Sequence, residues 1–300
     1  MENYITNTKI LKGNVVAERN KMFCLDIIDK YNLTPHIYIL LIGNDPASKY
    51  YVDSIKKKSE KYKIKITIDH IYDDEIDESI LINKIMDINN DPKIHGIMVQ
   101  KPLPKHIDAG KIEQLISAEK DIDGLHALNT GLMLSEKECF LPCTAQAIIE
   151  ILDFYGISTE GKHVVVLGRS NIVGKPIANL LLNKKNNRNA TVTICHSKTQ
   201  DISVHTRQAD IIITAIGVAN FLKAYMVKEN VIIIDAGINE IRNNENEKNY
   251  VGDVDYNDCI KISSAITPVP GGVGAVTTSI LLKHACISNM QKVTTKILNK

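Results

Sequence analysis

Apolar residues in the first half of the chain recur in two patterns, one typical of helices and one of short buried strands. Val15–Lys30 has the spacing of an amphipathic helix, and His36–Ile42 is a continuous apolar run that ends at a Gly-Asn-Asp-Pro turn. Beyond this turn we predict helices at Ala47–Tyr62 and Glu78–Asn89 and strands at Lys65–Ile71 and Gly96–Val99. Strands separated by helices of this length indicate βαβ units and a parallel sheet.

The second half repeats this alternation, with strands that are rich in β-branched residues. The predicted strands are Val164–Leu167, Thr191–Cys195, Ile211–Thr214 and Val231–Asp235. Such runs are expected for strands buried on both faces of a parallel sheet. Helices are predicted at Thr144–Phe154, which would join the halves, at Ile177–Leu182 and at Val276–His284.

We therefore expect an α/β fold with two domains. One is an N-terminal catalytic domain of βα units, and the other is a Rossmann-like, parallel-sheet nucleotide domain. Ligands should bind in a cleft between the domains, at the carboxyl ends of the strands.

Composition restricts the class of protein. The chain has 300 residues, 44% of them apolar, and a formal net charge of +1, so no general attraction to nucleic acid or membranes is expected. The N-terminus is polar, and no apolar run approaches the roughly 18 residues of a membrane span. The six cysteines are scattered, and Cys139 and Cys143 lack neighbouring ligands for a metal. We expect a cytoplasmic protein that binds no metal, nucleic acid or membrane.

A glycine-rich turn follows the first strand of the second half. Gly168–Pro176 reads GRSNIVGKP, and a strand, a turn and a helix start in this order place backbone N–H groups against a phosphate. The loop is one residue longer than the G-x-G-x-x-G pattern. A tight strand-to-helix turn without a ligand is the alternative.

The end of the next strand indicates which dinucleotide is bound. An NAD site would have an Asp or Glu there, whereas this chain has His196-Ser197-Lys198. A hydroxyl and a cation at that point, with Arg169 as a second cation, favour a 2′-phosphate. The expected cofactor is NADP.

Eight motifs, in the same order along the chain, resemble the bifunctional methylenetetrahydrofolate dehydrogenase/cyclohydrolase family. They are Asn44–Val52, Val99–Pro104, Lys120–His126, Gly168–Pro176, Thr191–Thr199, Ile232–Asn239, Gly252–Asp255 and Ile266–Gly274. The resemblance implies oxidation of methylenetetrahydrofolate with NADP and hydrolysis of the methenyl product to formyltetrahydrofolate, within the one-carbon metabolism that serves purine biosynthesis. It also implies a homodimer. Residues 1–143 plus 276–300 would form the folate-binding catalytic domain, and 144–275 the NADP-binding domain.

The resemblance also assigns residues to the two ligands. The matching substrate residues are Tyr51, Gln100, Asp123, Pro270 and Gly271. The matching cofactor residues are Gly168, Arg169, Ser170, Ser197, Ile238, Thr144 and Thr277. A carboxylate such as Asp123 can bind the donors of a pteridine ring through charge-assisted hydrogen bonds. Taken singly, Asp123 could be a turn residue and Tyr51 a core residue, but their joint occurrence in family order favours a site.

One position departs from the family pattern. The family has a lysine four residues after the active-site tyrosine, and this chain has Ile55 there. Because that lysine serves the cyclohydrolase proton chemistry, the alternative function is a monofunctional dehydrogenase. Lys101, where the family has leucine, and Lys56, about 100° round the helix from Ile55, are the catalytic candidates that could replace it, and each could equally point to solvent. A non-catalytic NADP-binding protein is a remote alternative, against which the retained Tyr51, Gln100 and Asp123 argue.

Overall fold

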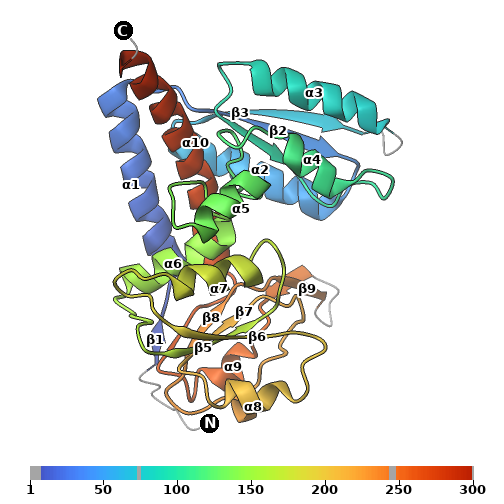
Figure 1. The fold of residues 1–300 in the computed structure, drawn as a ribbon. Helices are drawn as coiled ribbons and strands as arrows, with labels where there is room; N and C mark the ends of the chain where they lie inside the picture. Colours follow the sequence, from blue (N-terminus) through green and yellow to red (C-terminus); the bar gives the residue numbers. More distant parts are fainter. Residues whose placement is uncertain (1–7, 73–75, 243–247, 299–300) are drawn as a thin grey trace. The chain divides into compact units, whose positions relative to one another are not determined.

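Two parallel sheets form the centres of two units in the computed structural model, which describes residues 8–72, 76–242 and 248–298 (Figure 1). Unit 1 comprises the described parts of residues 1–17 and 144–277, and unit 2 those of residues 18–143 and 278–300. The unit boundaries fall within α1 (Gly13–Tyr31) and α10 (Val273–Leu298) and next to the first residue of α6 (Cys143–Phe154). The predicted two-domain α/β fold class is confirmed.

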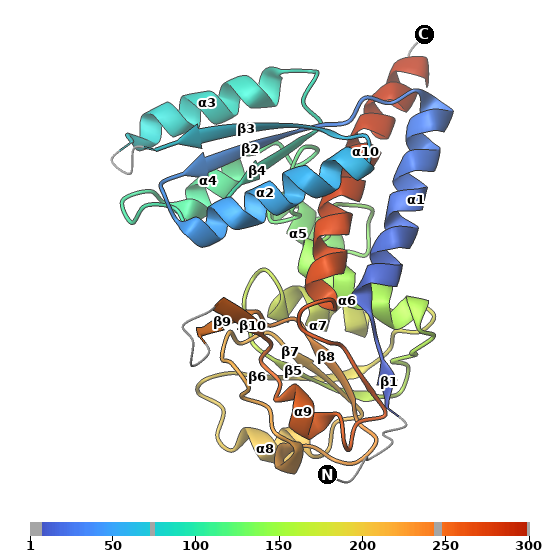
Figure 2. The same cartoon turned by 180° about the vertical axis from the view of Figure 1, so that it is seen from behind.

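Unit 2 is built on the three-stranded sheet β3–β2–β4. The strands are β2 (His36–Ile42), β3 (Lys65–Ile71) and β4 (Gly96–Val99), and their bounds are those predicted from the sequence. The helices α2 (Pro46–Lys61) and α3 (Glu78–Asn90) lie on opposite faces of this sheet (Figures 1 and 2). From β2 the chain passes to β3 on one side and then returns to β4 on the other, so the strand order reverses between β2 and β4.

The shorter helices of unit 2 are α4 (Ala109–Leu115) and α5 (Ala127–Leu134). Apolar side chains of α3, α4 and the sheet form one buried core, including Leu40, Leu81 and Ile112, each 0% exposed. The helix α2 begins at Asp45, whose carboxylate accepts a hydrogen bond from the Ser48 N–H group (2.8 Å). This cap satisfies one of the N–H groups that have no partner within a helix.

Unit 1 is built on the six-stranded parallel sheet β1–β11–β8–β7–β5–β6. The strands are β1 (Lys9–Ile10), β5 (His163–Leu167), β6 (Thr191–Cys195), β7 (Ile211–Thr214), β8 (Ile232–Asp235) and β11 (Ala265–Ile266). The sheet lies between α7 (Gly174–Leu182) on one face and α8 (Ile202–Thr206) and α9 (Tyr256–Cys259) on the other (Figures 1 and 2). An antiparallel pair, β9 (Asn239–Arg242) and β10 (Lys248–Val251), and the 3-10 helix η1 (Ala224–Met226) complete the unit.

The structure differs from the sequence-based prediction at the two ends of the chain. The strand β1 pairs with β11, with Lys9 opposite Ala265. The described part of the first 17 residues therefore belongs to unit 1, whereas the prediction placed it in the folate-binding domain. A strand of two residues is too short to show a period of two. At the other end, α10 continues to Leu298, beyond the predicted Val276–His284.

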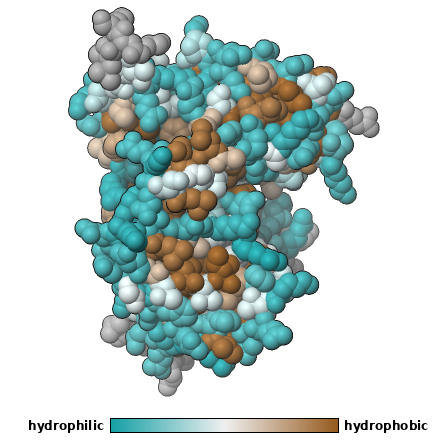
Figure 3. Space-filling model, in the orientation of Figure 1, coloured by the Kyte–Doolittle hydropathy of each residue, from teal (hydrophilic) through white to brown (hydrophobic). Residues whose placement is uncertain are grey.

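The surface drawn in Figure 3 is mostly hydrophilic, with separate apolar areas. Among the described helices, none is both long and apolar enough to cross a membrane. Within the same residues, no three His, Cys, Asp or Glu side chains are grouped so that they could hold a metal ion.

Candidate functional site

The carboxyl edge of the unit 2 sheet gathers the side chains predicted to bind substrate. Gln100 directly follows β4, and its N–H group donates to the Leu40 carbonyl (2.9 Å). A parallel bridge between Ile97 and Asp121 aligns the segment that leads to Asp123 with β4. These contacts bring Gln100 and Asp123 to the same edge of the sheet, where ligands of α/β proteins bind.

Asp123 is a partly buried carboxylate with charged neighbours. Burial raises the pKa of its carboxyl to about 6, and the negative charge of Asp121 contributes in the same direction. The Lys101 ammonium and a hydrogen bond with the Cys143 thiol oppose this rise, whereas Glu113 adds to it. Near neutral pH the carboxylate is therefore ionised but readily protonated, so that it can bind donor groups or accept a proton.

Tyr51 lies on α2 and hydrogen-bonds to the side chain of Thr278 on α10, within unit 2. Burial, followed by the negative charge of Asp123, raises the pKa of its phenol above the ordinary value. The hydroxyl therefore stays protonated near neutral pH. The Asp123 and Cys143 side chains both raise the pKa of this phenol, which means that the three side chains lie close together.

Gln100 carries a buried acceptor that has no partner among the described residues. Its Nε2 atom donates to the Lys101 carbonyl (2.6 Å), but its Oε1 atom receives no hydrogen bond. Leaving a buried acceptor unsatisfied costs about 1–3 kcal/mol. A ligand N–H group at this point would remove that cost, which supports a binding role for Gln100.

The two candidate amines differ in their surroundings. Lys56 is exposed on α2, whereas Ile55 beside it is fully buried. The Lys101 Nζ atom forms an ion pair with Glu113 Oε1 of α4 (2.5 Å). The charges of Lys101 and Glu113 both influence the pKa of Asp123, so Lys101 lies near the predicted site. Lys56 lies on the exposed side of α2.

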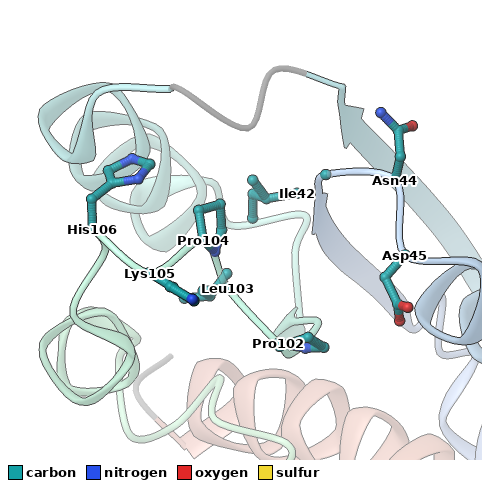
Figure 4. Close-up of a pocket in the computed structure, with 9 residues that line it drawn as sticks. Ile42, Asn44, Asp45, Pro102, Leu103, Pro104, Lys105 and His106 are labelled. Atoms are coloured by element: carbon teal, nitrogen blue, oxygen red, sulfur yellow. The ribbon is translucent and has the colours of Figure 1, made fainter.

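A pocket of about 430 Å³ opens at the carboxyl edge of the unit 2 sheet (Figure 4). It is lined by the end of β2 and the loop after it, residues 42–45, and by the loop after β4, residues 102–106. Tyr51, Gln100 and Asp123 are not among its lining residues. The Lys101 carbonyl, which also accepts from Ser48 Oγ (3.1 Å), connects the pocket to Gln100. The pocket lies where the strand order reverses between β2 and β4, which is the position expected for a ligand in such a sheet.

The sequence did not identify a role at this site for Cys143, Thr278 or Glu113. Thr278 is more than two hundred residues from Tyr51 along the chain, whereas Glu113 and Cys143 are 10 and 20 residues from Asp123, and none of the three lies in one of the eight motifs. Only the family motif PCT around Cys143 could have drawn attention to one of them.

In unit 1, the turn after β5 has the backbone geometry that a phosphate loop requires. Gly168 has φ +119°, and a Cβ atom there would lie 2.3 Å from the Ala215 carbonyl oxygen. A Cβ atom on Gly174 would lie 2.1 Å from the Gly168 carbonyl oxygen. Ser170 Oγ accepts from the Val173 N–H group (3.0 Å) and closes the turn. A loop held this close to its own helix can present its N–H groups to a phosphate.

Two exposed cations lie on neighbouring loops of this unit. The Gly168 N–H group donates to the Cys195 carbonyl (2.9 Å), which joins the end of β5 to the end of β6. Arg169 follows Gly168, and Ser197 and Lys198 come shortly after Cys195. All three side chains are exposed. The end of β6 carries no carboxylate, so the residues present suit the 2′-phosphate of NADP better than the free ribose hydroxyl of NAD.

The remaining predicted residues are distributed around unit 1. Ile238 is 67% exposed after β8, and Pro270 and Gly271 precede α10. Thr144 is the second residue of α6, and Thr277 is the fifth residue of α10. The sequence did not identify a role for Asp253. Its buried carboxylate accepts from the N–H groups of Ile216 (2.7 Å), Gly217 and Val218, and so fixes the turn after β7.

Comparison with known proteins decides the family. Residues 11–123 match the tetrahydrofolate dehydrogenase/cyclohydrolase catalytic domain, and residues 142–293 match the NAD(P)-binding domain of the same family. The chain belongs to this family. The resemblance stated from the sequence motifs is thereby confirmed.

Relatives and solved structures of the family cover nearly the whole chain. A bifunctional protein FolD of Chlamydia felis is 45% identical over 278 residues, 92% of this chain and 96% of the relative. The structure of the bifunctional enzyme FolD from Campylobacter jejuni is 40% identical, with a TM-score of 0.89 over 95% of this chain and 99% of that one. The Trypanosoma brucei enzyme, solved with NADP and an inhibitor, is 31% identical, with a TM-score of 0.89 over 95% and 98% of the two chains.

Proposed function

We propose that the protein oxidises methylenetetrahydrofolate to methenyltetrahydrofolate with NADP and hydrolyses the product to formyltetrahydrofolate. The observation that carries the proposal is the group Tyr51, Gln100 and Asp123 at one sheet edge, with the unsatisfied Oε1 atom of Gln100. The relatives named above are bifunctional, which favours two activities over the monofunctional alternative.

Within unit 2, each residue has a distinct task. The Asp123 carboxylate accepts hydrogen bonds from the N–H donors of the pteridine ring, and Gln100 Oε1 accepts one further donor. The protonated Tyr51 phenol, held by Thr278, packs against the substrate. These contacts fix the donor carbon in one position, which is the main requirement of hydride transfer.

Within unit 1, the turn Gly168-Arg169-Ser170 would hold the cofactor phosphates, and Arg169 with Ser197 would bind the 2′-phosphate. Thr144, Ile238 and Thr277 are proposed to complete the cofactor site, and Pro270 and Gly271 to contact substrate. When bound, NADP supplies the hydride acceptor.

The proposal is tested by mixing the protein with methylenetetrahydrofolate and NADP and measuring NADPH formation. We expect NADPH to form only when both compounds are present. If NADPH does not form with a folded protein that binds both ligands, the proposed oxidation is wrong.

Arg169→Ala should raise the Michaelis constant for NADP much more than that for NAD, because only NADP carries the 2′-phosphate. A charge-assisted contact of this kind contributes about 1.5–3 kcal/mol, or roughly 10- to 150-fold. Lys162→Ala is the matched control, since Lys162 is exposed and directly precedes β5, at the end of the strand opposite the turn. Equal effects of Arg169→Ala on both cofactors would show that Arg169 does not recognise the 2′-phosphate.

Folate affinity should depend on pH through Asp123. The pKa of this carboxyl is raised to about 6, so it becomes protonated as the pH falls below that value and loses its charge for the ring donors. The dissociation constant of methylenetetrahydrofolate should therefore increase as the pH is lowered from 7.5 to 5, while that of NADP changes less. A folate affinity that is constant over this range would contradict an ionised Asp123 as the binding group.

We further propose that the protein acts as a homodimer in the cytoplasm and that its product serves purine biosynthesis. These statements rest on membership of the family. Sedimentation of the purified protein tests the oligomeric state.

A further inference from the structure

Hydrolysis of the methenyl cation requires the movement of protons. The water oxygen forms a bond to the methenyl carbon, and the bond from that carbon to one ring nitrogen breaks, with its electron pair going to the nitrogen. That nitrogen takes up one proton, and the water gives up two. The protein therefore needs a proton donor near the pteridine ring, and a positioned donor contributes about 10²–10⁴-fold to such a rate.

Lys56, Lys58 and Lys101 are the candidate amines. Position 55 carries a buried isoleucine, so no amine extends from this position of α2. Lys56 is exposed, and Lys58 is half-buried two residues further along. Lys101 is the lysine whose charge acts on Asp123, and it adjoins Gln100 in the chain.

The backbone of Lys101 is held in place by both neighbouring elements. Its carbonyl accepts from Gln100 Nε2 (2.6 Å) and from Ser48 Oγ at the start of α2 (3.1 Å). Its side chain, 33% exposed, meets the 25% exposed side chain of Glu113 at 2.5 Å. The Lys101 backbone is thus held by two hydrogen bonds, and its ammonium group is paired with the Glu113 carboxylate.

We propose that Lys101 is the proton donor to the ring nitrogen in the hydrolysis step, and that Glu113 is the residue that positions its ammonium group. The inference rests on the proposed function. Lys101 transfers a proton as the carbon–nitrogen bond breaks, one proton from the attacking water returns to the amine, and the other is released to solvent. Lys101, in the loop after β4, thus donates the proton that a lysine at position 55 would otherwise donate.

The test compares hydrolysis of added methenyltetrahydrofolate with NADPH formation in single variants. Lys101→Met should slow hydrolysis by about 10²–10⁴-fold and change NADPH formation little. Lys101→Arg keeps the charge opposite Glu113, but a guanidinium does not release its proton, so its hydrolysis should remain slow. The exposed Lys57→Met serves as the control and should behave like the natural protein.

A pH profile of folate binding tests whether the charges of Lys101 and Glu113 lie close enough to Asp123 to influence its pKa. The pKa of Asp123 is influenced by Asp121, Lys101, Cys143 and Glu113. The charge of Asp123 in turn raises the pKa of Tyr51. Lys101 lowers the pKa of Asp123 and Glu113 raises it, so Lys101→Met should move the midpoint of folate binding to higher pH and Glu113→Gln to lower pH. Lys101→Arg should leave the midpoint near its natural value. Damage to the loop would not produce opposite shifts.

The outcomes are distinct. Slow hydrolysis in Lys101→Met and Lys101→Arg, with opposite pH shifts in Lys101→Met and Glu113→Gln, supports the inference. Unchanged hydrolysis in Lys101→Arg, or loss of hydrolysis in Lys56→Met or Lys58→Met but not in Lys101→Met, overturns it. Failure of the natural protein to form NADPH would instead overturn the proposed function.

Discussion

Asp123→Ala should weaken the binding of methylenetetrahydrofolate by about 10- to 150-fold, the equivalent of 1.5–3 kcal/mol for a hydrogen bond to a charged group. The carboxylate is partly buried and lies at the sheet edge of unit 2 beside Tyr51 and Gln100. Removing it takes away the negative partner of the ring donors and leaves those donors poorly solvated in the site.

The same variant should bind NADP almost as well as the natural protein does, because the nucleotide turn at Gly168 belongs to unit 1. Titration with each ligand separately is the measurement. Asp123→Asn is the matched variant, since it keeps the size and removes the charge, and it should resemble Asp123→Ala in folate affinity. A parallel loss of NADP affinity would mean that Asp123 supports the fold and not the substrate.

Ile55→Lys should restore hydrolysis in the Lys101→Met background, by up to about 10²–10⁴-fold. Side chains on a helix lean toward its N-terminus, so a lysine at position 55 extends over the turn that carries Tyr51.

Ile55→Met in the same background is the matched control, because it has similar length and no amine. It should leave hydrolysis slow. Because Ile55 is 0% exposed, the lysine variant will lower stability, and the thermal midpoint of each variant should be recorded. Equal hydrolysis by the lysine and methionine variants would show that an amine at this helix position does not serve the reaction.

The sequence predicted the strands of unit 2 well because each is a short apolar run that ends at a turn. The bounds of β2, β3 and β4 agree with the predicted ranges. The strand β1 could not be predicted, since two residues carry no periodicity and its pairing with β11 joins positions that are more than two hundred and fifty residues apart.

In the site, the residues of local motifs could be predicted, whereas their partners from other helices could not. Tyr51, Gln100 and Asp123 could be nominated because each lies in a local motif. The partners that determine their chemistry, Thr278 for Tyr51 and Cys143 and Glu113 around Asp123, come from α10, α6 and α4. The sequence could propose Lys101 as an amine near Gln100, but only the structure shows that Glu113 holds it.

The most direct test of the two proposed activities is a single time course. The natural protein is mixed with methylenetetrahydrofolate and excess NADP, and NADPH, the methenyl cation and formyltetrahydrofolate are followed together. We expect one NADPH per folate oxidised, a methenyl signal that stays low, and formyltetrahydrofolate that appears at the rate of NADPH. Methenyltetrahydrofolate that accumulates in proportion to NADPH and decays no faster than without the protein would contradict the bifunctional assignment.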